Sequence, residues 1–133
     1  MSLTIYYTSA RPVTPEEAKA IKSAAQRECQ GRSWLSCEPV RFFPDLQDGM
    51  LIGGSKPNFK PHRDDKRAAK ESGLPDGRPQ DLLDILARLS REHSVDWELM
   101  HDFGPIGTIR GGSVDPQALG QIEALGDIGG LFA

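Results

Sequence analysis

The sequence is poor in the residues that would identify a specialised class of protein. It has two cysteines, Cys29 and Cys37, among 133 residues, too few for a disulfide framework. No stretch approaches the roughly 18 apolar residues that a membrane-spanning helix needs. The three histidines and two cysteines show no metal-site spacing. We therefore expect no disulfide scaffold, no membrane span, no metal site and no cofactor.

The N-terminus and the net charge give expectations about the compartment and the partners of the protein. Met1 to Tyr7 has neither a basic region nor a long apolar region, so we expect no secretory signal and a cytoplasmic protein with reduced thiols. The formal net charge is −3 at pH 7. A chain of this charge is not expected to bind nucleic acid or an acidic membrane over its whole surface, although a local basic patch remains compatible with anion binding.

Three segments carry helix-start chemistry. Thr14-Pro15-Glu16-Glu17 combines a hydroxyl N-cap, a proline at the first helical position and a glutamate three residues after the cap. Proline opens two more apolar periodic segments, at Pro79 and, after Asp115, at Pro116. These signals predict helices over residues 15–30, 79–93 and 116–125.

Runs of alternating polarity between these helices predict strands. Asp48-Gly49 favours a hairpin turn between the second and third strands. Pro39 has no N–H for a strand ladder and places the second strand at a sheet edge. The predicted strands are residues 3–8, 37–43, 50–56, 95–99 and 106–110.

The resulting order, β-α-β-β-α-β, predicts a single α+β domain over residues 1–133. Its arrangement is the split βαβ of ferredoxin-like folds, with an antiparallel sheet, the helices on one face, a fifth strand and a C-terminal helix. We expect residues 57–78 to form a long polar loop that holds a short helix at 63–72. We expect residues 126–133, with three glycines, to form a flexible tail.

The segment from Gly53 to Lys70 is the main candidate for ligand binding. Its Gly-Gly-Ser-Lys run resembles a phosphate-binding loop only superficially, because Pro57 prevents a helix from starting at the lysine. Residues 56–71 carry six Lys or Arg against three Asp or Glu, and residues 81–133 carry three Arg against nine Asp or Glu. A solvated basic loop is one interpretation, and an anion site with an exposed aromatic ring is the other. The candidate binding residues are Lys56, Asn58, Phe59, Lys60, His62 and Arg63.

A second candidate group is Glu98, His101 and Asp102, which with His62 would supply a general acid and base. No nucleophile motif accompanies them. We therefore expect a small binding or interaction module without catalytic residues, and an enzyme that uses this group is the less favoured alternative.

Packing in the core or in a loop is the favoured interpretation of the aromatic residues, and self-association is the alternative. Trp97 lies on the apolar side of its strand and is expected in the core. Phe42 and Phe43 are adjacent on a predicted edge strand, so one of them faces away from the core, and Trp34 is either a loop anchor or an interface residue. We expect a protein partner or a homodimer that uses the sheet edge or the uneven charge surface.

Overall fold

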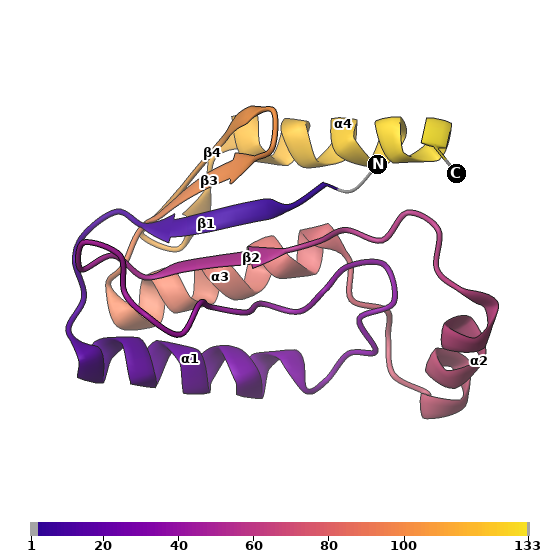
Figure 1. The fold of residues 1–133 in the computed structure, drawn as a ribbon, viewed down its shortest axis with the longest axis horizontal. Helices are drawn as coiled ribbons and strands as arrows, with labels where there is room; N and C mark the ends of the chain where they lie inside the picture. Colours follow the sequence, from indigo (N-terminus) through magenta and orange to yellow (C-terminus); the bar gives the residue numbers. More distant parts are fainter. Residues whose placement is uncertain (1–2, 133) are drawn as a thin grey trace.

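The protein is a single α+β domain with four helices and one five-stranded antiparallel sheet (Figure 1). The structure, a computed structural model, describes residues 3–132 and the side chains of residues 3–124. The helices are α1 (Pro15–Cys29), α2 (Arg63–Ser72), α3 (Pro79–His93) and α4 (Pro116–Phe132). The strands are β1 (Ile5–Ser9), β2 (Ile52–Ser55), β3 (Trp97–His101), β4 (Gly104–Arg110) and β5 (Ser113–Val114).

Helix α1 begins as its sequence predicts. The Thr14 hydroxyl accepts a hydrogen bond from the Glu17 N–H, and the Glu17 carboxylate accepts one from the Thr14 N–H, each at 3.1 Å. This reciprocal capping box satisfies two N–H groups that a helix start leaves without partners. The bounds of α1 and α3 agree with the predicted helices to within one residue.

The strand order is β2-β1-β3-β4-β5, so β1 is an interior strand. Alternate residues of β1 and β3 point to opposite faces of the sheet. Ile5 and Tyr7 of β1 and Trp97 and Leu99 of β3 are buried on one face. Helices α1 and α3 pack against each other, and α4 contacts β4 and α3 (Figure 1). The other face of the sheet is described below.

The predicted strand over residues 37–43 does not form. Cys37 and Phe42 make only isolated bridges, to Pro57 and Gly53. Pro39 interrupts the ladder, and the Arg41 N–H donates to the Tyr7 hydroxyl at 2.8 Å instead of to a strand. Gly53 permits this contact, because any Cβ there would run into the Tyr7 ring and the Arg41 carbonyl oxygen. The segment is therefore extended but irregular beside β2.

The turn between this segment and β2 has the predicted chemistry. Asp48 has φ 52° and Gly49 has φ 80°. Two successive positive φ values are typical of the type I′ hairpin turn that Asp-Gly favours. Gln47 and Met50 close the turn with two backbone hydrogen bonds of 2.9 and 3.0 Å.

The last helix extends beyond the predicted end at residue 125. Helix α4 continues through residue 132, and only residue 133 of the predicted tail lies outside the described residues. Glycine lowers helix stability by about 1 kcal/mol per interior residue but does not stop a helix as proline does. None of the helices within residues 3–132 is long and apolar enough to cross a membrane.

Candidate functional site

The long connection between β2 and α3 contains the short helix predicted at residues 63–72. His62 caps the N-terminus of α2 with Nδ1, which accepts a hydrogen bond from the Asp64 N–H at 3.1 Å. Gly73 ends the helix at φ 70°, a left-handed conformation that glycine adopts at little cost. Helix α2 has no buried residue and lies at one end of the molecule (Figure 1). It is thus held by its ends and not by a packed face.

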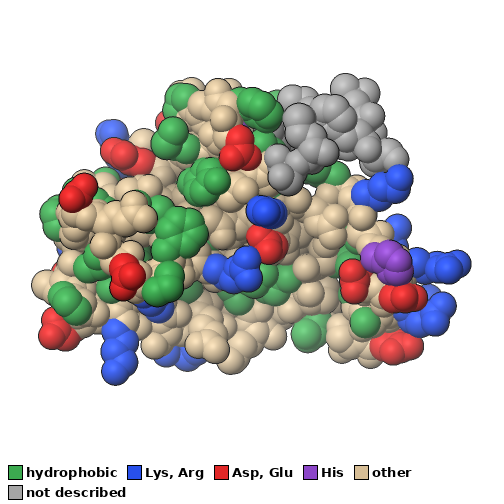
Figure 2. Space-filling view, in the orientation of Figure 1, with side chains coloured by type: hydrophobic (Ala, Val, Ile, Leu, Met, Phe, Trp, Pro, Cys, Tyr) green, Lys and Arg blue, Asp and Glu red, His purple; other side chains and the backbone are tan. Residues whose placement is uncertain are grey.

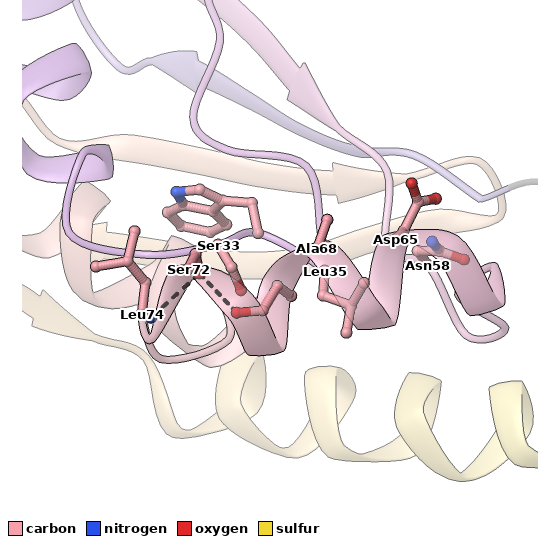
Figure 3. Close-up of a pocket in the computed structure, with 9 residues that line it drawn as sticks. Ser33, Leu35, Asn58, Asp65, Ala68, Ser72 and Leu74 are labelled. Atoms are coloured by element: carbon pink, nitrogen blue, oxygen red, sulfur yellow. Dashed lines mark hydrogen bonds between the residues drawn. The ribbon is translucent and has the colours of Figure 1, made fainter.

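A cleft of about 350 Å³ lies between α2 and the segment that follows α1. Figure 3 shows Asp65 and Asn58 at one end of the cleft, Leu74 at the other, and Ala68 and Leu35 between them. The cleft is lined by Ser33, Trp34, Leu35, Asn58, Asp65, Ala68, Ala69, Ser72 and Leu74. Ser33 and Ser72 lie near Leu74, so the division between the two ends is one of charge: the carboxylate of Asp65 lies at the end away from Leu74 (Figure 3).

Trp34 forms part of the cleft wall in an unusual backbone conformation. Its φ is 52°, which costs a non-glycine residue roughly 1–2 kcal/mol. Two contacts hold it there. The indole Nε1–H donates to the Cys29 carbonyl at 2.7 Å, and the ring packs so closely on Gly77 that a Cβ at that position would overlap it. Backbone strain of this kind is concentrated at functional sites in proteins.

Asp76 fixes the rest of this wall. Its Oδ1 accepts hydrogen bonds from the N–H groups of Leu35 and Ser36, both at 2.9 Å, and its Oδ2 accepts one from the Ser36 hydroxyl. Partial burial opposes ionisation of this carboxyl, but the hydrogen bonds from Ser36 and Leu35 outweigh it and lower the pKa of Asp76. The wall is therefore ordered before any ligand arrives.

The structure places the predicted binding residues in different surroundings. Lys56, Lys60 and Arg63 are exposed and form no ion pair or side-chain hydrogen bond within the described part of the chain. Phe59 was expected to be an exposed stacking surface, but it is half-buried and packs against the core. His62 caps α2.

Only Asn58 of the predicted set lines the cleft. The cleft residues that the sequence analysis missed include Asp65, Ala68, Ala69 and Ser72. Their spacing of i, i+3, i+4 and i+7 is that of one helical stripe and is the signal by which they could have been found.

The predicted catalytic group is not assembled. The Nδ1 of His101 accepts a hydrogen bond from the Phe103 N–H at 2.9 Å, and Asp102 Oδ2 accepts one from the Thr4 N–H at 2.7 Å. Glu98 is exposed on the other side of the strand from Trp97. Within residues 3–124, no hydrogen bond or ion pair joins Glu98, His101, Asp102 or His62 to one another.

The cysteines and the potential metal-binding side chains form no further candidate site among the described residues. Burial raises the pKa of the Cys37 thiol to about 12, so this group is protonated and unreactive at neutral pH. Among the described residues, no group of three His, Cys, Asp or Glu side chains is placed to hold a metal ion. No family model, no curated protein and no solved structure matches the chain.

Two other clefts, of about 550 and 390 Å³, border α1, and Lys22 and Gln26 contribute to both. Lys22 Nζ donates to the Pro44 carbonyl at 3.1 Å. This hydrogen bond ties α1 to the irregular segment beside β2.

The face of the sheet opposite the core carries a row of apolar side chains. The register places Tyr6 of β1 between Gly54 of β2 and Met100 of β3, and Met100 opposite Pro105 of β4. Met100 is 51% exposed, and Phe103 in the following turn is 68% exposed. Figure 2 shows hydrophobic side chains gathered over the strands, while charged side chains crowd over α2 at the right-hand end.

Met100 is a further surface residue that lies outside the predicted sites. It follows the alternating residues Val95, Trp97 and Leu99 at a position where the pattern calls for a polar side chain. An apolar residue on the polar side of a strand was the available signal.

Proposed function

We propose that this protein is a small binding module, without catalytic residues of its own, that docks a protein partner on the open face of its sheet. In the simplest case the partner is a second copy of the chain. The observation that carries the proposal is Met100, a large hydrophobic side chain that is 51% exposed on this open face. Exposed apolar patches of this kind mark interaction sites on soluble proteins.

The arrangement around Met100 supports a docking surface. Tyr6 lies over Gly54, whose missing side chain leaves room for the ring. Tyr6, Met100 and Pro105 therefore form one row across three paired strands, and a rigid sheet holds them in fixed positions. Aromatic residues and methionine are enriched at the cores of protein interfaces.

The face serves this role better than the sheet edge at residues 37–43 that the sequence suggested, because those residues form no continuous strand. The outer side of β2 is already occupied, because the Phe43 N–H donates to the Ile52 carbonyl at 2.8 Å and the Gly54 N–H donates to the Arg41 carbonyl at 3.1 Å. An edge whose backbone groups are paired offers little to an incoming strand.

Sedimentation velocity over a wide concentration range tests self-association, and affinity capture with the purified protein as bait tests other partners. Met100→Lys and Tyr6→Ser should each weaken the interaction by tenfold or more, because both side chains belong to the row at the centre of the proposed interface. Leu119→Ser is the matched control, because Leu119 is 47% exposed on α4 and outside the row. Interaction that survives both substitutions unchanged would remove the proposal.

The basic segment remains a second candidate, as an anion-binding surface. Lys56, Lys60 and Arg63 are exposed side chains without an ion-pair partner in the described part of the chain, so their charges are available to an anionic ligand. Binding of such a ligand would weaken as the salt concentration rises.

We also propose that the sheet is a modified ferredoxin-like sheet and that the module works in a reducing compartment such as the cytoplasm. The irregular segment 36–43 runs antiparallel beside β2, in the position of the second strand of a split βαβ unit. The free thiols of Cys29 and Cys37 agree with a reducing environment.

A further inference from the structure

Helix α2 turns one chemically distinct stripe toward the cleft. Asp65, Ala68, Ala69 and Ser72 recur at i, i+3, i+4 and i+7, and all four line the cleft. An amphipathic helix in a folded protein normally buries such a stripe against the core. Helix α2 buries no residue, so its inner stripe faces an open space of about 350 Å³.

The charge of the cleft is opposite to that of the helix as a whole. Asp65 is the one ionisable residue of the lining, and within the described residues it has no ion-pair partner within 4.0 Å. The four basic residues of α2 lie on the remaining faces of the helix and do not line the cleft: Arg63, Lys66, Arg67 and Lys70. A ligand in the cleft therefore meets a carboxylate.

The two ends of the cleft favour different parts of a ligand. Asp65 and Asn58 form a polar end, and Leu74 lies at the opposite end, with Ala68 and Leu35 between them (Figure 3). The indole of Trp34 adds an aromatic wall that Gly77 and the Cys29 carbonyl hold in place. Aromatic faces attract cations as well as apolar groups.

We propose that this cleft binds a small primary amine that carries an apolar body. The ammonium group pairs with the Asp65 carboxylate, and the apolar body packs against Trp34, Ala68 and Leu74. The volume is at the lower end of the range for ligand sites, about 300–1,000 Å³, and fits a molecule of one ring and a short chain. This site is separate from the open face of the sheet, so either proposal can fail without the other.

The test uses 2-phenylethylamine as the probe and follows the amide and indole resonances of the full chain by two-dimensional NMR. 3-Phenylpropionate is the matched probe of opposite charge. The Trp34 indole and the amides of Ala68 and Ala69 should shift with the amine, with a Kd on the order of 0.1–1 mM because Asp65 is exposed. 3-Phenylpropionate should bind at least tenfold more weakly.

Three variants locate the binding. Asp65→Asn should weaken amine binding about tenfold through loss of a charged hydrogen bond. Ala68→Phe should abolish it by filling the cleft, and Ala69→Phe provides a second filling variant. Asp64→Asn is the matched control, because it removes the same charge from the neighbouring residue, which does not line the cleft. Circular dichroism establishes that each variant is folded.

Three outcomes would overturn the proposal. One is the absence of amine-induced shifts at Trp34, Ala68 and Ala69 up to millimolar concentration. Another is equal binding of 3-phenylpropionate, which would show that the carboxylate does not select the ligand. The last is equal loss of affinity in Asp64→Asn and Asp65→Asn, which would indicate a general charge effect of α2 and not a site in the cleft.

Discussion

Replacement of Gly77 by alanine tests whether the Trp34 ring is fixed by the backbone contact beneath it. A Cβ at Gly77 would overlap three atoms of the indole ring, Cε3, Cδ2 and Cζ3. Overpacking of this kind costs about 1–3 kcal/mol, and displacement of the ring would also break its hydrogen bond to the Cys29 carbonyl, worth about 1 kcal/mol. Alanine regains about 0.4–1 kcal/mol by restricting the unfolded chain. The net loss of unfolding free energy should be about 1–3.5 kcal/mol.

A double-mutant cycle isolates this contact. In a Trp34→Ala background the overlap is gone, so Gly77→Ala should cost no more than about 0.5 kcal/mol. Urea unfolding followed by far-UV circular dichroism measures all four proteins, and Gly31→Ala is the control because a Cβ there meets nothing within 4 Å. An equal cost of Gly77→Ala in both backgrounds would show that the Trp34 ring is not what the new methyl group disturbs.

Three further predictions concern other parts of the molecule. Gly53→Ala should lower the unfolding free energy, measured by urea unfolding, by about 2–4 kcal/mol. The new methyl group would collide with the Tyr7 ring and weaken the buried hydrogen bonds of its hydroxyl. A cost under about 1 kcal/mol would contradict this. The difference in unfolding free energy between the parent protein and Asp76→Asn should be largest at neutral pH and should shrink as the pH falls below about 4, because the hydrogen bonds that lower the pKa of Asp76 stabilise the fold only while the carboxyl is ionised. A difference that does not shrink in acid would refute this. The triple variant Lys56→Glu, Lys60→Glu and Arg63→Glu reverses the charge of the basic segment. It should leave the unfolding midpoint nearly unchanged and abolish any salt-sensitive binding of phosphate ligands. A parent protein that binds no such ligand at low salt would remove the anion hypothesis.

The parts of the fold that could be predicted are those encoded within a few residues of sequence. The capping box at Thr14 and Glu17 is local, and its two hydrogen bonds form as the spacing requires. The positive φ values of Asp48 and Gly49 likewise follow from the preferences of two adjacent residues. Local signals of this kind do not depend on how the rest of the chain packs.

The failure at residues 37–43 has a long-range cause. Alternation of side chains predicts a strand, but the backbone of Arg41 is bonded to the hydroxyl of Tyr7, which lies 34 residues earlier in the chain. Ser55 donates to the Pro39 carbonyl at 2.7 Å in the same network. A buried polar side chain must satisfy its hydrogen bonds, and here it does so with backbone groups that a regular strand would use. No pattern within residues 37–43 reveals this competition.

The candidate sites show the same division between local and long-range information. The cleft stripe from Asp65 to Ser72 and the apolar exception at Met100 are both present in the local pattern, since each departs from what a solvated helix or a half-buried strand requires. The opposite wall of the cleft is not visible in the local pattern. It depends on the contact of Trp34 with Gly77 and on the hydrogen bond from Leu35 to Asp76, which join residues about forty positions apart. The composition of the segment predicts a basic surface at α2. In the structure the basic side chains of α2 do not line the cleft, and the carboxylate of Asp65 does. The sign of the charge that a ligand meets is therefore a property of the helix face, and net charge per segment is a poor guide to it.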